Sequence, residues 1–121
     1  MAGSYDGVVA LATFIGPTGG IREIDAQQNG SGASTESITT SGPGLTSDYV
    51  PLFGMNRGTS TDTCNVGSQL KTAQSAGGNG SGSLYSEVPG SNAAITATFG
   101  YSSAGSANFQ AIVMVGGLVA S

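Results

Sequence analysis

The sequence contains no histidine, no tryptophan, one cysteine and only three basic residues among its 121. Without histidine, the chain lacks the usual general base at neutral pH and every Ser-His or Cys-His nucleophile arrangement, so most hydrolase mechanisms are excluded. One cysteine and no histidine also argue against a zinc site. Cys64 has no partner for an internal disulfide, and we expect it to be a half-buried, small apolar side chain.

Charge is equally scarce. Charged residues make up 8% of the chain, and the formal net charge is −4, whereas a typical domain has about 25% charged residues. Three basic side chains are too few to neutralise a phosphate backbone, so we expect no nucleic-acid partner. The seven carboxylates are scattered along the chain. Glu23 and Asp25 would share one face of a strand, where two carboxylates can bind Ca²⁺. A solvated polar face is the alternative that we favour, and we predict no catalytic residue, cofactor or metal and therefore no enzyme.

Long apolar runs are also missing. No run approaches the roughly 20 residues of a membrane-spanning helix, and Gly116-Gly117 interrupts the run near the C-terminal end. No basic segment precedes Val8–Ile15, and Asp6 stands where a signal peptide would carry Lys or Arg. We therefore expect neither a membrane span nor a secretion signal.

The sequence does contain short runs rich in Val, Ile, Thr, Phe and Tyr, separated by breaks that hold many of its 21 glycines. In the clearest run, Ile95 to Tyr101, apolar residues alternate with Thr and Gly, and Gly77–Gly80 is the strongest hairpin signal. Pro51 cannot donate to a ladder, which predicts an edge strand or a bulge there. The expected strands are residues 8–15, 21–26, 35–40, 48–55, 65–76, 83–88, 95–101 and 109–115. No helix is long enough for a crossover, so the pattern predicts a single all-β domain over residues 1–121, an antiparallel β-sandwich or jelly roll of about eight short strands.

The first and last of these runs are apolar on both faces. From Val88 to Ser121 there is no charged residue, and in the final run Ile112 and Met114 lie opposite an equally apolar face. In one sandwich only one face of each sheet meets the core, so the second face needs a covering, most economically another chain. We predict that the two runs form a central antiparallel pair and that oligomerisation supplies part of the stability. The expected interface residues are Val9, Leu11, Ile15, Ile112 and Met114.

Aromatic side chains offer a second kind of site. Small β-sandwiches often stack sugars on aromatic platforms, and Tyr85 and Tyr101 lie beside polar loops. They are the candidates for ligand binding, and a position in the core or on a sheet face is the alternative that we favour.

The chain resembles small jelly-roll proteins of tailed bacteriophage particles in its composition, which is low in charge and rich in Gly, Ser, Thr and Ala. The segments that carry the resemblance are the opening run Val8–Ile15, the hairpin before Leu84-Tyr85, and the closing runs Ala94–Phe99 and Ala111–Val115. The proteins that it resembles are capsid decoration or cement proteins and the distal domains of tail fibres, and the likeness spans most of the chain. It implies a virion protein without enzymatic activity that is made and assembled in the host cytoplasm. The implied partners are further copies of itself, with trimers as the expectation, and a major capsid protein.

Two functions follow as hypotheses. The first is a decoration or cement protein that binds and stabilises a phage capsid lattice through oligomeric contacts. The alternative is a carbohydrate- or receptor-binding module of a tail fibre or a secreted protein. A small hydrolase is disfavoured, because no base and nucleophile can be named.

Overall fold

The computed structural model describes residues 19–30, 33–58, 60–74, 80–102 and 107–117. Within these ranges the chain forms eight β-strands and no helix, which confirms the all-β prediction. The strands are β1 (Gly20–Asn29), β2 (Thr35–Thr39), β3 (Val50–Asn56), β4 (Asp62–Cys64), β5 (Ser68–Gln74), β6 (Ser81–Glu87), β7 (Thr96–Tyr101) and β8 (Asn108–Gly116).

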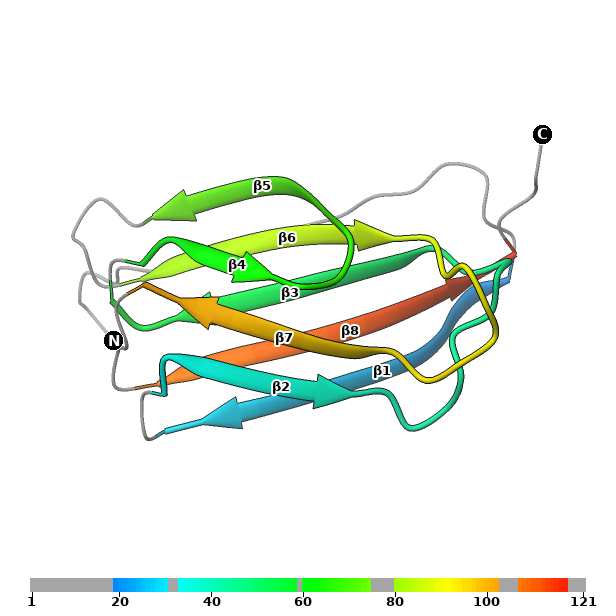
Figure 1. Ribbon diagram of the computed structural model, residues 1–121, viewed down its shortest axis with the longest axis horizontal. Coiled ribbons are helices and arrows are strands. Elements are labelled where there is room, and N and C mark those ends of the chain that lie inside the picture. The colour runs from blue at the N-terminus through cyan, green and yellow to red at the C-terminus, as the bar shows by residue number, and fades with distance from the viewer. Residues whose placement is uncertain (1–18, 31–32, 59, 75–79, 103–106, 118–121) are drawn as a thin grey trace, which may run out of the picture.

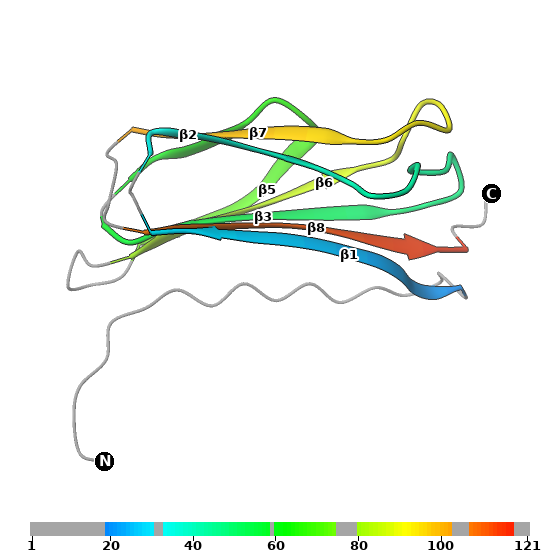
Figure 2. The same ribbon diagram turned by 90° about the horizontal axis from the view of Figure 1, so that it is seen from below.

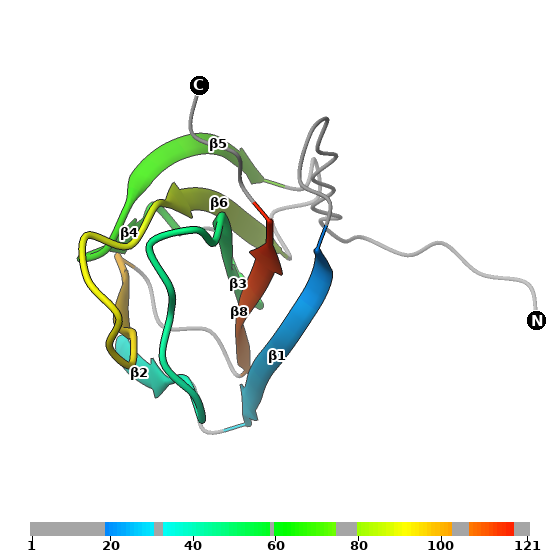
Figure 3. The same ribbon diagram turned by 90° about the vertical axis from the view of Figure 1, so that its right-hand side faces the viewer.

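The strands form two antiparallel sheets that pack against each other (Figure 1). The larger sheet has the order β1-β8-β3-β6-β5, and the smaller has the order β2-β7-β4. Figure 2 shows the two layers from the side, and Figure 3 shows the larger sheet curving from β1 round to β5. The prediction of an antiparallel sandwich is therefore confirmed.

Most predicted strands agree closely with observed ones. The expected hairpin before Leu84 is present as the antiparallel pair β5 and β6. The predicted strand 21–26 is too short, because the polar half of β1 stays paired with β8 as far as Asn29. The predicted strand 65–76 starts too early, since β5 begins at Ser68 after a turn in which Gly67 has a φ of 78°. β4 was not predicted, because three residues are too few to show alternation, and the run Val8–Ile15 lies outside the described residues.

The prediction that Pro51 marks an edge or a bulge is wrong. β3 is the central strand of the larger sheet, with β8 on one side and β6 on the other. The pairing of β3 with β8 covers Leu52–Asn56 and resumes only at a bridge between Tyr49 and Val115. Pro51 lies in this gap, where its missing N–H removes one ladder bond to β8. An interior strand thus accepts proline at the cost of a local interruption.

The core lies where the inward sides of both sheets meet. Its largest fully buried apolar side chains are Phe99 of β7, Leu52 and Val50 of β3, and Ile112 and Met114 of β8. The ring of Tyr85 meets Phe99 edge-on, with centroids 6.2 Å apart. Phe99 fits because β3 carries Gly54 beneath it: a Cβ at that position would lie 2.6 Å from Cδ1 of Phe99.

At one end of the sandwich, Arg22 of β1 forms an ion pair with Asp48, which lies just before β3. The Arg22 guanidinium also donates to the carbonyl of Pro43 at 3.0 Å and contacts Sδ of Met114 at 3.0 Å. The Asp48 side chain, almost fully buried, accepts a further hydrogen bond from the N–H of Leu45 at 2.8 Å. Burial alone would raise the pKa of Asp48, but the hydrogen bonds from Arg22 and Leu45 outweigh it and lower the pKa below 3.8. The pair therefore joins β1 to the turn before β3.

Gly54→Ala is expected to destabilise the fold by about 1–3 kcal/mol, because the added methyl group overpacks the core against Phe99. Urea unfolding of the variant measures this loss. Adding Phe99→Leu should make the double variant more stable than the sum of the two single changes allows, since the smaller side chain relieves the clash. Equal stability of Gly54→Ala and the wild type would contradict the packing described here.

Arg22→Met is expected to cost about 2–3 kcal/mol at neutral pH, because it leaves the buried Asp48 carboxylate without its counter-charge. A carboxylate with a lowered pKa stabilises the fold above its ordinary pKa and loses that effect as the pH falls. The difference between wild type and variant should therefore shrink below pH 3.8, the ordinary value for Asp48. Unfolding measured from pH 7 to pH 3 checks this, with the exposed Arg57→Met as the matched control. A difference that stays constant with pH would contradict it.

Candidate functional site

The candidate functional site is the side of the larger sheet that faces away from the smaller one. Because side chains alternate along a strand, the inward positions of Leu52, Tyr85 and Ile112 place their neighbours on this side. We call it the outer face. Its members within the strands are Ile21, Ile24, Ala26 and Gln28 of β1; Phe109, Ala111, Val113 and Val115 of β8; Pro51, Phe53 and Met55 of β3; Gly82, Leu84 and Ser86 of β6; and Ser68, Lys71 and Ala73 of β5.

The outer face is apolar, and among its described strand positions Lys71 is the only charged one. Three of its large apolar side chains are exposed: Ile21 by 64%, Ile24 by 59% and Phe109 by 36%. Ile21 and Ile24 lie on β1, whereas Phe109 lies on β8 four residues from Val113, the partner of Ile24. The outward residues Ala111 and Val115 of β8 are buried, so the exposed apolar side chains are on β1 and at the start of β8. Large apolar side chains that are exposed in this way favour an interaction site over an ordinary solvated face.

The interior of the sandwich, by contrast, holds many polar groups. Gln110 is fully buried, and its Nε2 lies 2.6 Å from the Tyr101 hydroxyl and 3.0 Å from Oδ1 of Asn108. Further buried polar side chains are Asp48, Asn56, Ser60, Asp62, Ser81 and Ser83. The interior thus contains amide, hydroxyl and carboxyl groups, while Ile21, Ile24 and Phe109 are exposed on the outer face. Polar groups inside and large apolar side chains outside are expected when the outer face is also covered by a partner.

The prediction that Ile112 and Met114 contact a partner is wrong. Both are completely buried in the core between the sheets. The two faces of this strand are equally apolar in sequence, so alternation alone could not say which one points inward. The register of β8 with β3 decides it, because it sets Ile112 opposite Leu52 and Ala111 opposite Phe53. The other predicted interface residues, Val9, Leu11 and Ile15, lie outside the described residues.

The smaller sheet presents a different surface. Its outward positions are threonine, serine and glycine, with the hydroxyls of Ser37 and Thr98 2.8 Å apart and those of Thr39 and Thr96 2.9 Å apart. This face carries hydroxyl groups on all three strands, since Thr63 of β4 also points outward. The sandwich therefore has one hydroxyl-rich side and one apolar side.

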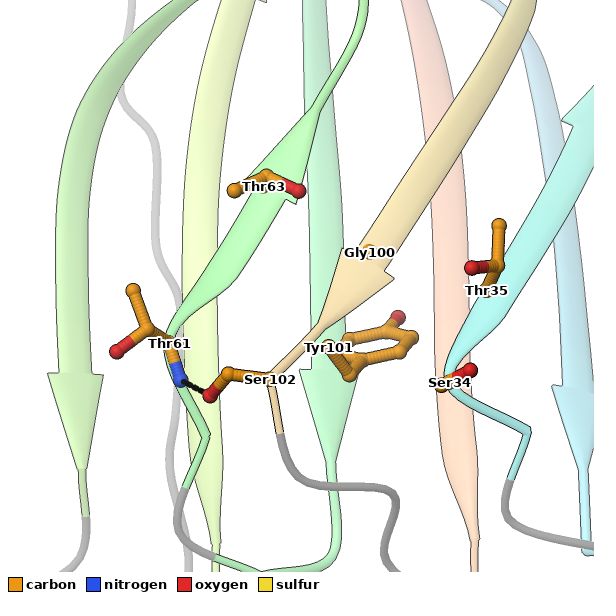
Figure 4. Close-up of a pocket in the computed structure, with 7 residues that line it drawn as sticks. All are labelled: Ser34, Thr35, Thr61, Thr63, Gly100, Tyr101 and Ser102. Atoms are coloured by element: carbon orange, nitrogen blue, oxygen red, sulfur yellow. Dashed lines mark hydrogen bonds between the residues drawn. The ribbon is translucent and has the colours of Figure 1, made fainter.

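A shallow depression of about 430 Å³ lies on this hydroxyl-rich side (Figure 4). Gly100 on the middle strand pairs with Thr35 on one neighbour and Thr63 on the other, so the missing side chain leaves a hollow between two threonines. The depression is lined by Ser34, Thr35, Thr61, Thr63, Gly100, Tyr101 and Ser102. Ser102 is held by a hydrogen bond of 2.8 Å from the Thr61 N–H to its hydroxyl.

Tyr85 and Tyr101, the candidates for ligand binding, are not available to stack on a ligand. Their exposed fractions are only 4% and 5%, and both rings belong to the core. Each has its hydroxyl in a buried hydrogen bond: Tyr85 donates to the carbonyl of Asp62 at 2.8 Å, and Tyr101 accepts from Gln110. Burial raises the pKa of Tyr101 to about 12. The alternative, a core position, is the one observed.

Glu23 and Asp25 hold the loop before β3. Glu23 Oε1 accepts from the N–H of Gly42 at 2.9 Å, and Asp25 Oδ1 accepts from the hydroxyl of Ser41 at 2.8 Å. Their carboxylates therefore fasten β1 to the loop. In the described part of the chain, no three His, Cys, Asp or Glu side chains gather as metal ligands. Cys64 is half-buried against the core, as expected, and burial raises the pKa of its thiol.

Within the described ranges, no helix has the length and apolar character that crossing a membrane requires. Comparisons with protein-family models, curated proteins and solved structures find no match to the chain.

Proposed function

We propose that this chain is a structural module that joins an assembly through the outer face of its larger sheet, as a decoration or cement protein on a phage capsid. The observation that carries the proposal is the apolar outer face, on which Ile21, Ile24 and Phe109 are exposed while several polar residues are buried in the interior. Such a protein needs no reactive group, because its function is to bind and stabilise the assembly. Its partners would be further copies of the chain and a major capsid protein.

Burial of the exposed apolar side chains would drive this association. Apolar surface removed from water contributes about 25 cal/mol per Å², and isoleucine and phenylalanine expose more such surface than most side chains. Ile21, Ile24 and Phe109 are therefore the residues expected to contribute most. The described outward strand positions carry no acidic side chain, and their one charged residue, Lys71, lies on the edge strand β5, so few charges would have to be desolvated on association.

The two sides of the sandwich give the module an orientation. The hydroxyl-rich side of the smaller sheet is suited to water, and the outer face of the larger sheet is suited to a protein partner. A subunit bound through the larger sheet would present serine and threonine to the solvent. This arrangement suits a protein that covers the surface of a particle without promoting aggregation of the particles.

The double variant Ile24→Lys, Phe109→Lys tests the proposal. Both residues are exposed on the single chain, so the variant is expected to keep its fold and its circular dichroism spectrum. Desolvation of two lysines would oppose association, so the mass measured by light scattering should fall from that of an oligomer to that of a monomer. Binding to purified phage particles should fall by at least about tenfold, the effect of about 1.4 kcal/mol.

Thr39→Lys with Thr61→Lys is the matched control, because it adds the same charge to exposed positions on the smaller sheet. This control should retain the oligomeric mass. A wild type that is monomeric and binds no particle would overturn the proposal, as would a double variant on the outer face that assembles normally.

A second candidate function is recognition of a neutral carbohydrate, which the hydroxyl-lined depression at Gly100 favours. The depression offers hydrogen-bonding groups but no exposed ring among the tyrosines that were predicted to stack. Gly100→Val would fill the hollow, since a Cβ there comes within 2.7 Å of the Thr63 hydroxyl. This function predicts glycan-array signals that disappear in Gly100→Val and persist in the outer-face variant. An array without wild-type signal would count against it.

A further inference from the structure

In the described part of the chain, five buried side-chain oxygen atoms have no hydrogen-bond partner, and four of them belong to one cluster between the sheets: both carboxyl oxygens of Asp62 and the hydroxyl oxygens of Ser81 and Ser83. The exposed fractions are 3% for Asp62, 1% for Ser81 and 3% for Ser83. Buried polar groups in folded proteins nearly always have a partner, and a group that lacks one points to a bound water or ion. The proposed assembly surface makes no use of these atoms.

The oxygen atoms come from opposite sheets. Asp62 points inward from β4, between the outward residues Thr61 and Thr63, while Ser81 and Ser83 point inward from β6. The hydrogen bond from the Tyr85 hydroxyl to the Asp62 carbonyl ties β4 to β6. The cluster lies towards the end of the sandwich where β4 and β6 begin and β7 ends (Figure 1).

The Asp62 carboxyl group also lacks a matching positive charge. The described ion pair of the chain uses Arg22 with Asp48, next to Met114 on β8 rather than beside β4. The other ionisable groups that interact with Asp62 are the hydroxyls of Tyr85 and Tyr101, which carry no positive charge in any state. Burial raises the pKa of Asp62, and the nearby hydroxyls of Ser60, Ser81 and Ser83 oppose that rise by favouring the charged form.

We propose that Asp62, Ser81 and Ser83, with Ser60 beside them, bind a hard metal cation between the two sheets. An all-oxygen set of carboxylate and hydroxyl groups suits hard cations and lacks the imidazole and thiolate ligands of zinc or copper. A single carboxylate balances a single positive charge, so charge balance favours Na⁺ over Ca²⁺ in this buried position. The cation would join β4 to β6 and satisfy all four oxygen atoms.

Thermal unfolding of the full chain in different salts tests the site. At equal ionic strength, replacing choline chloride by sodium chloride should raise the Tm of the wild type by about 5 °C when Na⁺ is about tenfold above its dissociation constant. Calcium chloride in a parallel series shows whether the divalent ion is bound instead. A rise with either metal ion supports the site and identifies its ion.

Asp62→Asn should abolish this rise and remain folded, because an amide can donate to the serine hydroxyls without a net charge. Ser83→Ala gives a second, milder variant in which the rise should be reduced. Glu87→Gln is the control, because it removes one carboxylate at the opposite end of β6 from Ser81, and it should respond to the salts as the wild type does. Equal Tm values for the wild type in all three salts, or an unchanged rise in Asp62→Asn, would overturn the proposal.

Discussion

The packing of β7 on β8 and β3 across the sandwich is the interaction on which the rest of the structure depends. Phe99 lies over Gly54, and Leu52, Ile112 and Met114 complete the buried layer around it. Because side chains alternate along a strand, this contact fixes the direction of every other residue in β8. Once Ile112 and Met114 are inside, Phe109 and Val113 have to face outward.

The outer face is therefore a consequence of how the core is made. The second side of β8 faces away from the smaller sheet, where Phe109 is exposed, and the pairing of β1 with β8 adds the exposed side chains of Ile21 and Ile24. The interior, meanwhile, contains an ion pair at Asp48 and a polar group around Asp62 and Gln110. A core that is partly polar contributes less hydrophobic stabilisation than its size suggests. Burial of the outer face by a partner would therefore supply a larger share of the free energy of folding.

Sequence reasoning found the architecture because its strongest signals were local. The alternation from Ile95 to Tyr101 and the glycine-rich hairpin before Leu84 depend on neighbouring residues, and both were correct. It failed where the answer depends on distant partners. The choice between the two faces of β8 needs the register with β3, and the interior position of Pro51 needs the whole sheet order.

The candidate sites were harder to predict than the fold. Tyr85 and Tyr101 sit beside polar loops in sequence, but the inward alternation of their own strands buries them. Asp62 gave no signal, since a three-residue strand hides the fact that its carboxylate points inward. The final strand is apolar on both sides, and the two residues assigned to the interface, Ile112 and Met114, lie on the side that faces the core.

The central claim is that the outer face is buried in an assembly that stabilises the fold. The most direct measurement is thermal unfolding over about a hundredfold range of protein concentration, combined with the mass in solution at each concentration. The account predicts a Tm that rises with concentration together with a mass above that of the 11.8 kDa chain. A monomeric mass with a constant Tm over the whole range would contradict it.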